Sequence, residues 1–232
     1  MNAIILAAGL GSRFKDVTKT IHKALLPLKD GTPNIERTIE YLIDANIKDI
    51  YIVTGHLAYQ FEYLRDKYNC HLINNHHYDK YNNIFSFMCA VDYFGDSFVI
   101  DSDVTLFNNI FLDNPQNSCY YLIQRPKGEN KEWVPVIING RIKNIRIDNS
   151  YSPSLLGISY WTKTDSNIIK ECLKNYSDEK YLLDPKLYWD NIPMELLECL
   201  DVRAKLLAKL DAYEIDNLEE YNFMLELSSF EK

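Results

Sequence analysis

The chain begins with a short apolar segment that opens directly into a glycine loop. Residues 4–8 read Ile-Ile-Leu-Ala-Ala and predict a buried strand, and Gly9-Leu10-Gly11-Ser12-Arg13 follows without a break. Lys23 lies ten residues beyond Arg13. Glycines leave backbone N–H groups open to phosphate oxygens, and the two cations can neutralise their charge. In open α/β sheets, ligands gather at the carboxyl ends of strands. This order therefore predicts a nucleoside triphosphate site at the end of the first strand.

The loop differs from the two commonest phosphate loops. Phe14 occupies the position where G-x-G-x-x-G requires its third glycine, and no G-K-[S/T] follows at P-loop spacing. Both the dinucleotide-binding and the Walker interpretations are therefore excluded. The alternative is that Gly9 and Gly11 only form a tight turn. This alternative does not explain why Arg13 and Lys23 accompany the two glycines.

The first half of the chain alternates strands and helices. The pattern predicts strands at 49–54, 71–73 and 97–101, and helices at 33–46, 57–68 and about 83–93. The segment 97–101 is a continuous β-run whose three central residues are apolar, as in a strand buried on both faces. We therefore expect a three-layer α/β/α, Rossmann-like architecture around a mainly parallel mixed sheet.

The second half is richer in strands. It predicts strands at 118–124, 133–138, 141–147 and 156–161, a helix at 165–175, a strand at 213–215 and a helix at 217–228. The composition of 196–210 favours a helix, although 201–204 could form an edge strand. We expect a single domain over 1–232, with a nucleotide-binding half (about 1–115) and a smaller β-rich acceptor lobe (about 116–232).

Two pairs of carboxylates are candidates for a metal site. Asp101 and Asp103 follow a buried strand, so they point toward the same sheet edge as the glycine loop. Glu214 and Asp216 are two apart on a late strand and face the same way. Mg²⁺ binds through one or two carboxylates together with substrate phosphates. One alternative is an Asx-type cap of the following turn, with Asp101 solvated. For the second pair, the alternative is that Asp216 or Asn217 caps the last helix.

Amide side chains are candidates for reading a base. Asn82 and Asn83 precede a predicted helix, with Ser86 one turn further on. Amides offer both donors and acceptors to a base edge. At least one of the two asparagines is expected to cap the helix instead.

Aromatic residues beside acids suggest the acceptor. The pair Glu132-Trp133 and the triplet Tyr188-Trp189-Asp190 combine rings with carboxylates. A quaternary ammonium ion has no N–H to donate and is bound by aromatic faces with a nearby carboxylate. We expect Trp133 and Trp189 in the pocket and Trp161 in the core; core packing is the alternative for all three. Arg125 is either a contact to the acceptor phosphate or a solvated loop charge.

These motifs resemble a known family. The segment from Leu6 to Arg13, followed by Lys23, is similar to the signature of the nucleotidyltransferases that activate sugar 1-phosphates and related phosphomonoesters. Most members have proline before the lysine, where this chain has His22. With the acidic, amide and aromatic motifs, the whole chain resembles the phosphocholine cytidylyltransferase branch.

The resemblance implies site residues. Arg13, Lys23, Asp103 and Asp216 are the implied catalytic residues, and Asp103 and Asp216 are the implied Mg²⁺ ligands. The implied nucleotide-binding residues are Leu6, Ala7, Ala8, Gly9, Leu10, Gly11, Ser12, Arg13, Lys23, Asn82, Asn83, Ser86 and Asp101. The implied acceptor-binding residues are Arg125, Glu132, Trp133, Tyr188, Trp189, Asp190 and Glu214.

The reaction implied by the resemblance is transfer of CMP from CTP to phosphocholine, which gives CDP-choline, for decoration of the cell surface, and pyrophosphate. A phosphomonoester with a second pKa of about 6 is already a dianion at neutral pH, so its attack on the α-phosphorus needs no general base. The alternatives are a sugar 1-phosphate acceptor, a phosphoethanolamine or aminophosphonate acceptor, and a non-catalytic nucleotide sensor.

The charge and cysteine content of the chain limit the binding partners and the location that we expect. The formal charge of −8 argues against nucleic acid or an anionic membrane as the partner. Five widely spaced cysteines without C-x-x-C predict reduced thiols in a cytoplasmic protein. A homodimer is possible.

Overall fold

The computed structural model describes residues 1–125 and 131–227, and strands form its centre. The strands are β1 (Asn2–Ala7), β2 (Ile50–Thr54), β3 (His71–Asn74), β4 (Ser97–Asp101), β5 (Val104–Leu106), β6 (Cys119–Ile123), β7 (Glu132–Ile138), β8 (Arg141–Asp148), β9 (Ser154–Trp161), β10 (Arg203–Leu206) and β11 (Ala212–Glu214). The helices are α1 (Asn34–Asp44), α2 (Tyr63–Tyr68), α3 (Asn83–Cys89), α4 (Lys163–Leu173), α5 (Glu179–Leu182), α6 (Asn191–Glu195) and α7 (Leu218–Leu227).

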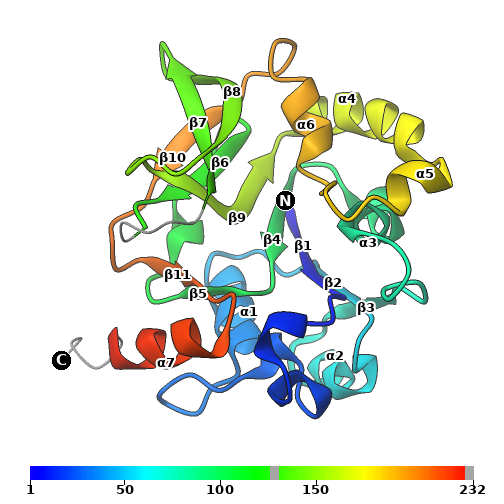
Figure 1. Ribbon diagram of the computed structural model, residues 1–232, viewed down its shortest axis with the longest axis vertical. Helices are drawn as coiled ribbons and strands as arrows, with labels where there is room; N and C mark the ends of the chain where they lie inside the picture. Colours follow the sequence, from blue (N-terminus) through cyan, green and yellow to red (C-terminus); the bar gives the residue numbers. More distant parts are fainter. Residues whose placement is uncertain (126–130, 228–232) are drawn as a thin grey trace.

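In the described part of the chain, nine strands form one mixed sheet in the order β3-β2-β1-β4-β9-β6-β10-β8-β7 (Figure 1). Strand β1 lies between β2 and β4 and is parallel to both, and β3 continues this parallel half. Strand β9 is antiparallel to β4 and to β6 and joins the second half of the chain to the first. The predicted α/β class with a mixed sheet is confirmed.

Strand β10 corrects the prediction for 196–210. The chain forms a strand there, and the strand is internal. It runs parallel to β6, with Arg203 opposite Cys119 and Leu206 opposite Leu122, and Arg203 also pairs with Arg141 of β8. The half-buried polar side chains of Arg203 and Lys205 hid this position, because an internal strand is usually apolar on at least one face. Helices α5 and α6 were also not predicted, since each is little more than one turn long.

Two apolar clusters cover the two faces of the sheet. Ile5 of β1 packs in the cluster that includes Ile39 of α1, whereas Ile4 packs in the cluster that includes Phe87 of α3 and Ile169 of α4. Successive side chains of a strand point to opposite faces. The alternation in β1 therefore produces the three layers, with α1 and α2 on one side and α3 and α4 on the other (Figure 1).

A second, smaller pairing brings the end of the chain back to the end of β4. Strand β11 is antiparallel to β5, with Glu214 opposite Val104, and Ile215 N–H donates to the Asp103 carbonyl at 3.0 Å. Ile215 then packs in a third cluster with Phe14, which lies in the turn that follows the glycine loop. Acids from the middle and from the end of the chain therefore meet at one sheet edge.

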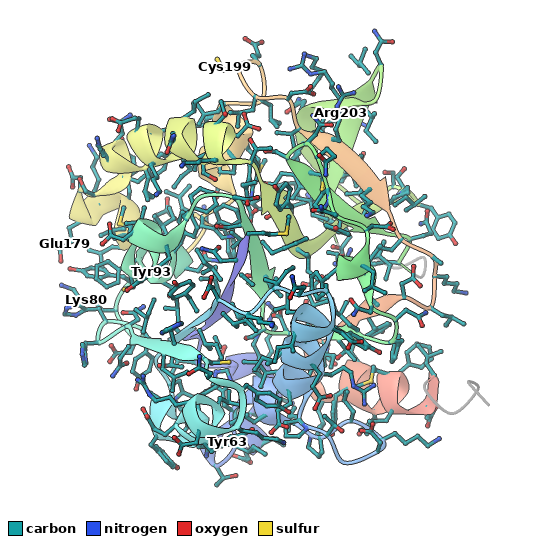
Figure 2. The ribbon with its side chains drawn as sticks, turned by 180° about the vertical axis from the view of Figure 1, so that it is seen from behind. Tyr63, Lys80, Tyr93, Glu179, Cys199 and Arg203 are labelled. Carbon is teal, nitrogen blue, oxygen red and sulfur yellow. The ribbon has the colours of Figure 1, made fainter. Side chains whose placement is uncertain are left out.

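Figure 2 shows the opposite side of the molecule, where Lys80 and Glu179 join the segment before α3 to α5 through an ion pair of 2.6 Å. Among the described cysteines none forms a disulfide, and Cys199 is exposed while Cys70 and Cys119 are buried. Over 1–125 and 131–227, the chain has no helix of the length and apolarity that crossing a membrane requires.

Gly157 allows β9 to pass close to Asp101. Its φ is +84°, and a Cβ there would lie 2.9 Å from Asp101 Oδ2. We expect Gly157→Ala to lower the free energy of unfolding by about 1–3 kcal/mol, because it adds backbone strain and displaces a buried carboxylate. Chemical denaturation measures this. Gly95→Ala is the matched control, since a Cβ at Gly95 meets nothing within 4 Å. Equal stability of the two variants would contradict the expectation.

Candidate active site

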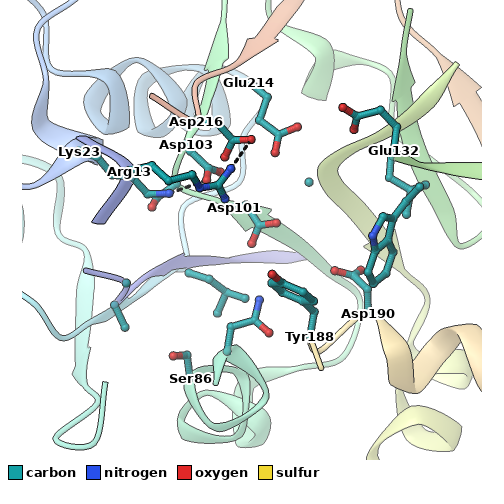
Figure 3. Close-up of a pocket in the computed structure, with 18 of the residues that line it drawn as sticks. Arg13, Lys23, Ser86, Asp101, Asp103, Glu132, Tyr188, Asp190, Glu214 and Asp216 are labelled. Atoms are coloured by element: carbon teal, nitrogen blue, oxygen red, sulfur yellow. Dashed lines mark hydrogen bonds and ion pairs between the residues drawn. The ribbon is translucent and has the colours of Figure 1, made fainter. Parts of the chain in front are cut away.

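A cavity of about 560 Å³ opens at the carboxyl ends of β1 and β4 (Figure 3). It is lined by many of the residues that the sequence singled out: Leu6, Ala8, Gly9, Arg13, Lys23, Asn83, Ser86, Asp101, Asp103, Arg125, Glu132, Trp133, Tyr188, Asp190, Glu214 and Asp216. Phosphate-binding motifs and aromatic–acidic motifs more than a hundred residues apart thus share one cavity.

The glycine loop is shaped by one left-handed residue. Gly11 has φ +61°, and a Cβ there would lie 2.9 Å from Thr18 Cγ2. Thr18 Oγ1 donates to the Gly11 carbonyl at 3.0 Å, and buried Phe14 anchors the following turn. The loop is therefore held by its own neighbours, and Gly9 faces the cavity.

Four predicted loop and strand residues do not line the cavity. Ala7 is buried in the core, and Leu10 and Ser12 are exposed. Gly11 serves the conformation of the loop and is not among the lining residues. Side chains alternate in direction along a strand, which turns Ala7 away from the cavity side taken by Leu6 and Ala8.

Both cations of the motif are paired with acids (Figure 3). Lys23 Nζ lies 2.5 Å from Asp103 Oδ2, and Arg13 Nη1 lies 2.7 Å from Asp216 Oδ2. Burial alone would lower the pKa of Lys23, but the Asp103 carboxylate, with Asp101 and Asp216 further away, raises it above the ordinary value. Lys23 is therefore a permanent positive charge in the cavity.

Asp103, Glu214 and Asp216 form a group with metal-binding geometry. One carboxylate oxygen from each lies within 4.8 Å of the others. Asp103 Oδ1 is buried and has no hydrogen-bond partner within the described residues. A buried carboxylate oxygen without a partner is costly, and hard divalent cations bind such oxygens. The residues present therefore fit a divalent metal.

The side chain of Asn217, and not that of Asp216, caps helix α7. Asn217 Oδ1 accepts from Glu220 N–H at 2.9 Å, and Glu220 Oε2 accepts from Asp216 N–H at 2.7 Å. This arrangement resembles a capping box, except that the Glu220 side chain accepts from the residue before the cap. It uses only the backbone of Asp216, so the Asp216 carboxylate is available to the acidic group.

Arg125 lies between two carboxylates. Its guanidinium is paired with Glu214 and lies 3.5 Å from Glu132 Oε2, and Nη1 donates to Ser154 Oγ at 2.5 Å. Any role assigned to Arg125 must therefore account for its contacts with these two acids. Arg125 is half-buried, so the solvated alternative is wrong.

Two further carboxylates lie deeper in the cavity. Burial raises the pKa of Asp190 to about 7, although Tyr120 donates a hydrogen bond to its Oδ1 at 3.0 Å. Burial, together with the charges of Asp103 and Asp190, raises the pKa of Asp101 well above the usual range. Carboxyl groups with raised pKa values favour a cationic ligand, because a nearby positive charge stabilises their ionised form.

Trp133 and Tyr188 form an aromatic corner beside these acids. Their ring centroids are 5.8 Å apart with an interplanar angle of 87°, and Tyr188 is 45% exposed. Figure 3 shows Tyr188 between Asp101 and Asp190. Both aromatic residues line the cavity.

Trp189 does not belong to this corner. It is buried, stacked on Phe87 at 4.7 Å and set edge to face against Trp161 at 6.0 Å. The expectation of a pocket position for Trp189 is wrong, because consecutive residues of this turn point in opposite directions and Tyr188 takes the cavity side. Trp161 lies in the core as predicted.

Asn82 is also removed from the candidate site. Its Oδ1 accepts from Ile84 N–H, and its Nδ2 donates to the carbonyls of Tyr181 and Asp184, each at 2.8 Å. The capping alternative is correct, and no amide atom is left for a base. Asn83 does line the cavity, where its Oδ1 accepts from Trp189 N–H. Ser86 lines the cavity beside it.

Sequence reasoning missed five lining residues: Ser102, Tyr120, Lys131, Leu155 and Gly157. Tyr120 comes from a predicted strand and Leu155 lies one residue before another, and no local motif marks either of them. Ser102 carried a signal, because it stands between the two predicted acids.

A strand-end glycine loop, two cations and an acidic group define a site for nucleotidyl transfer. Residues 3–114 match the family model of the MobA-like NTP transferase domain. The chain is 52% identical over 227 residues to a choline-phosphate cytidylyltransferase from Haemophilus influenzae, covering 97% of each chain. The solved structure of CTP:phosphocholine cytidylyltransferase from Streptococcus pneumoniae matches with a TM-score of 0.92 and 34% identity over 98% of each chain.

A 2-aminoethylphosphonate cytidylyltransferase from Lancefieldella rimae is 33% identical over 222 residues, covering 91% of this chain and 88% of that one. The resemblance seen in the sequence is confirmed. The chain belongs to the nucleotidyltransferase family, in the branch of the cytidylyltransferases.

Adjacent aromatic residues should respond differently to truncation. We expect Trp189→Ala to lower the free energy of unfolding by about 3–5 kcal/mol, because it leaves a cavity in the core. Tyr188→Ala should cost less than about 1 kcal/mol, since Tyr188 is 45% exposed. Urea denaturation compares the two. Wild-type stability of the Trp189→Ala variant would contradict the core position of Trp189.

Proposed function

We propose that this protein transfers CMP from CTP to phosphocholine and releases pyrophosphate and CDP-choline. The observation that carries the proposal is the composition of one cavity. Its phosphate end contains the glycine loop, Lys23 and the acidic group, and its other end contains the Trp133–Tyr188 corner over buried carboxylates. The cytidylyltransferase relatives support the choice of CTP.

At the phosphate end, the chain binds and orients the triphosphate. Gly9 offers unobstructed backbone, and Lys23 and Arg13 supply positive charge for the β- and γ-phosphates and then for the leaving pyrophosphate. No residue needs to act as a base, since the acceptor phosphate is a dianion at neutral pH. Catalysis by this chain therefore consists of alignment and charge stabilisation.

The acidic group is proposed to hold Mg²⁺. Asp103 and Asp216 are the proposed ligands, with Glu214 beside them, and the partnerless Asp103 Oδ1 supports a role for Asp103. When bound, Mg²⁺ supplies charge stabilisation to the phosphate oxygens. Asn83 and Ser86 line the same cavity and are the proposed contacts to the nucleoside.

At the other end, the chain recognises the head group of the acceptor. A trimethylammonium group packs against the faces of Trp133 and Tyr188, while Asp190 and Asp101 balance its charge. Arg125 is the proposed contact to the acceptor phosphate, and Glu132 and Glu214 orient its guanidinium.

A second acceptor class has a specific observation in its favour. A primary ammonium group donates hydrogen bonds, and Asp190 and Asp101 are carboxylates within the cavity that can accept them. The relative from Lancefieldella rimae is named for 2-aminoethylphosphonate, which carries a primary ammonium group. The aromatic corner favours the quaternary ammonium ion, because a primary amine gains less from ring faces than from acceptors.

The metal proposal predicts the behaviour of Asp103→Asn. We expect kcat/KM to fall by about 10²–10³-fold, because the variant loses a charged ligand at the site of phosphate neutralisation. Magnesium titration of pyrophosphate release measures this. The exposed carboxylate of Asp66 provides the control Asp66→Asn. Near-normal turnover of folded Asp103→Asn would remove Asp103 from the metal site.

The corner predicts a selective effect on the acceptor. We expect Trp133→Ala to raise KM for phosphocholine by about 10- to 30-fold, because a desolvated cation–π contact contributes about 2 kcal/mol. KM for CTP should change little. Steady-state kinetics with each substrate varied in turn separates the two constants. If both rise together, or if the variant unfolds, Trp133 is a structural residue.

A further inference from the structure

His22 precedes Lys23 and is buried, and both of its ring nitrogens and its backbone N–H form hydrogen bonds. Its Nδ1 accepts from Ala24 N–H at 3.1 Å, which caps the turn that carries Lys23. Its Nε2 lies 3.2 Å from the Gly9 carbonyl. Its backbone N–H donates to Gln60 Oε1 at 2.9 Å. The ring therefore touches both parts of the phosphate site.

One protonation state of the ring satisfies both ring contacts. Because Nδ1 accepts a hydrogen bond, the proton of the neutral imidazole is on Nε2, which then donates to the Gly9 carbonyl. Burial, reinforced by the charge of Lys23, lowers the pKa of His22 to about 4. The neutral form thus persists across the physiological pH range, and both contacts are permanent.

The segment after β2 forms further hydrogen bonds to the backbone on either side of the glycine loop. Gln60 Nε2 donates to the Thr20 carbonyl at 2.7 Å, and His56 Nε2 lies 2.7 Å from the Thr18 carbonyl. His56 N–H donates to the Ala8 carbonyl at 3.1 Å. His22 is the member of this set that reaches the cavity-lining Gly9 and is next to Lys23 in the chain.

We propose that His22 is a positioning residue for nucleotide binding, which fixes the Gly9 backbone relative to the Lys23 ammonium group. This inference rests on the proposed function of the cavity. The triphosphate must meet the loop backbone and Lys23 at once, and the imidazole ring is a direct link between these two parts. Without the link, Gly9 can shift relative to Lys23, and binding of CTP must restore the alignment at the expense of affinity.

Two variants separate the parts of this role. His22 has φ −66° and ψ 139°, so proline fits its φ, but His22→Pro removes both ring contacts and the backbone N–H. His22→Asn keeps a capping side chain that can accept from Ala24 N–H, yet it is too short to span to the Gly9 carbonyl. His76→Ala, at an exposed loop position, is the control for loss of an imidazole.

The test measures the dissociation constant of CTP by calorimetry in Mg²⁺ without acceptor, and KM for phosphocholine in parallel. We expect His22→Pro and His22→Asn each to weaken CTP binding by about fivefold or more, as loss of one hydrogen bond implies. KM for phosphocholine and the control should not change. Thermal melting monitored by circular dichroism establishes that each variant is folded.

Wild-type affinity for CTP in folded His22→Asn would show that only the cap matters and would overturn the inference. An equal loss for CTP and phosphocholine would overturn it as well. If His22→Pro does not fold, His22→Asn alone decides. Because CTP binding is measured without an acceptor, a wild-type protein that binds CTP but does not turn over phosphocholine would refute the proposed acceptor and leave the test of His22 valid.

Discussion

The pairing of β11 with β5 is the constraint on which the candidate site depends. It places Ile215 N–H on the carbonyl of Asp103, so residues 112 positions apart are in register through one backbone hydrogen bond of 3.0 Å. Alternation along the strand then turns Glu214 and Asp216 toward Asp103, while Ile215 packs behind them against Phe14. The same apolar contact holds the turn that carries Arg13. Acids and cations are thus positioned by a shared piece of core.

The charges in the cavity form pairs that a ligand can exchange. Lys23 is paired with Asp103, Arg13 with Asp216, and Arg125 with Glu214. Pairing lowers the cost of placing several charges in a partly buried cavity of an acidic protein. A metal ion bound there would compete for the carboxylates, and phosphates would compete for the cations, so the two together would preserve the balance of charge.

Local motifs allowed the phosphate end of the site to be predicted. Residues 4–13 and Lys23 are adjacent in sequence and in space, and their chemistry needs little tertiary information. The placement of Trp189 could not be predicted in the same way, since only the packing against Phe87 decides which of two adjacent rings faces the cavity. Likewise, Asn82 and Asn83 are indistinguishable in sequence, and only the carbonyls of Tyr181 in α5 and of Asp184 beyond it mark out Asn82. The division into two halves, a possible homodimer and a cytoplasmic location stay predictions.

The most direct measurement is pyrophosphate release by the purified protein with Mg²⁺ and each of the four nucleoside triphosphates, against phosphocholine, phosphoethanolamine and glucose 1-phosphate. We predict release with CTP and phosphocholine alone, because the aromatic corner selects the quaternary ammonium ion. Release with glucose 1-phosphate would leave the fold and the metal site intact but contradict the acceptor assignment. No release with any combination, from folded protein, would contradict the proposed reaction itself.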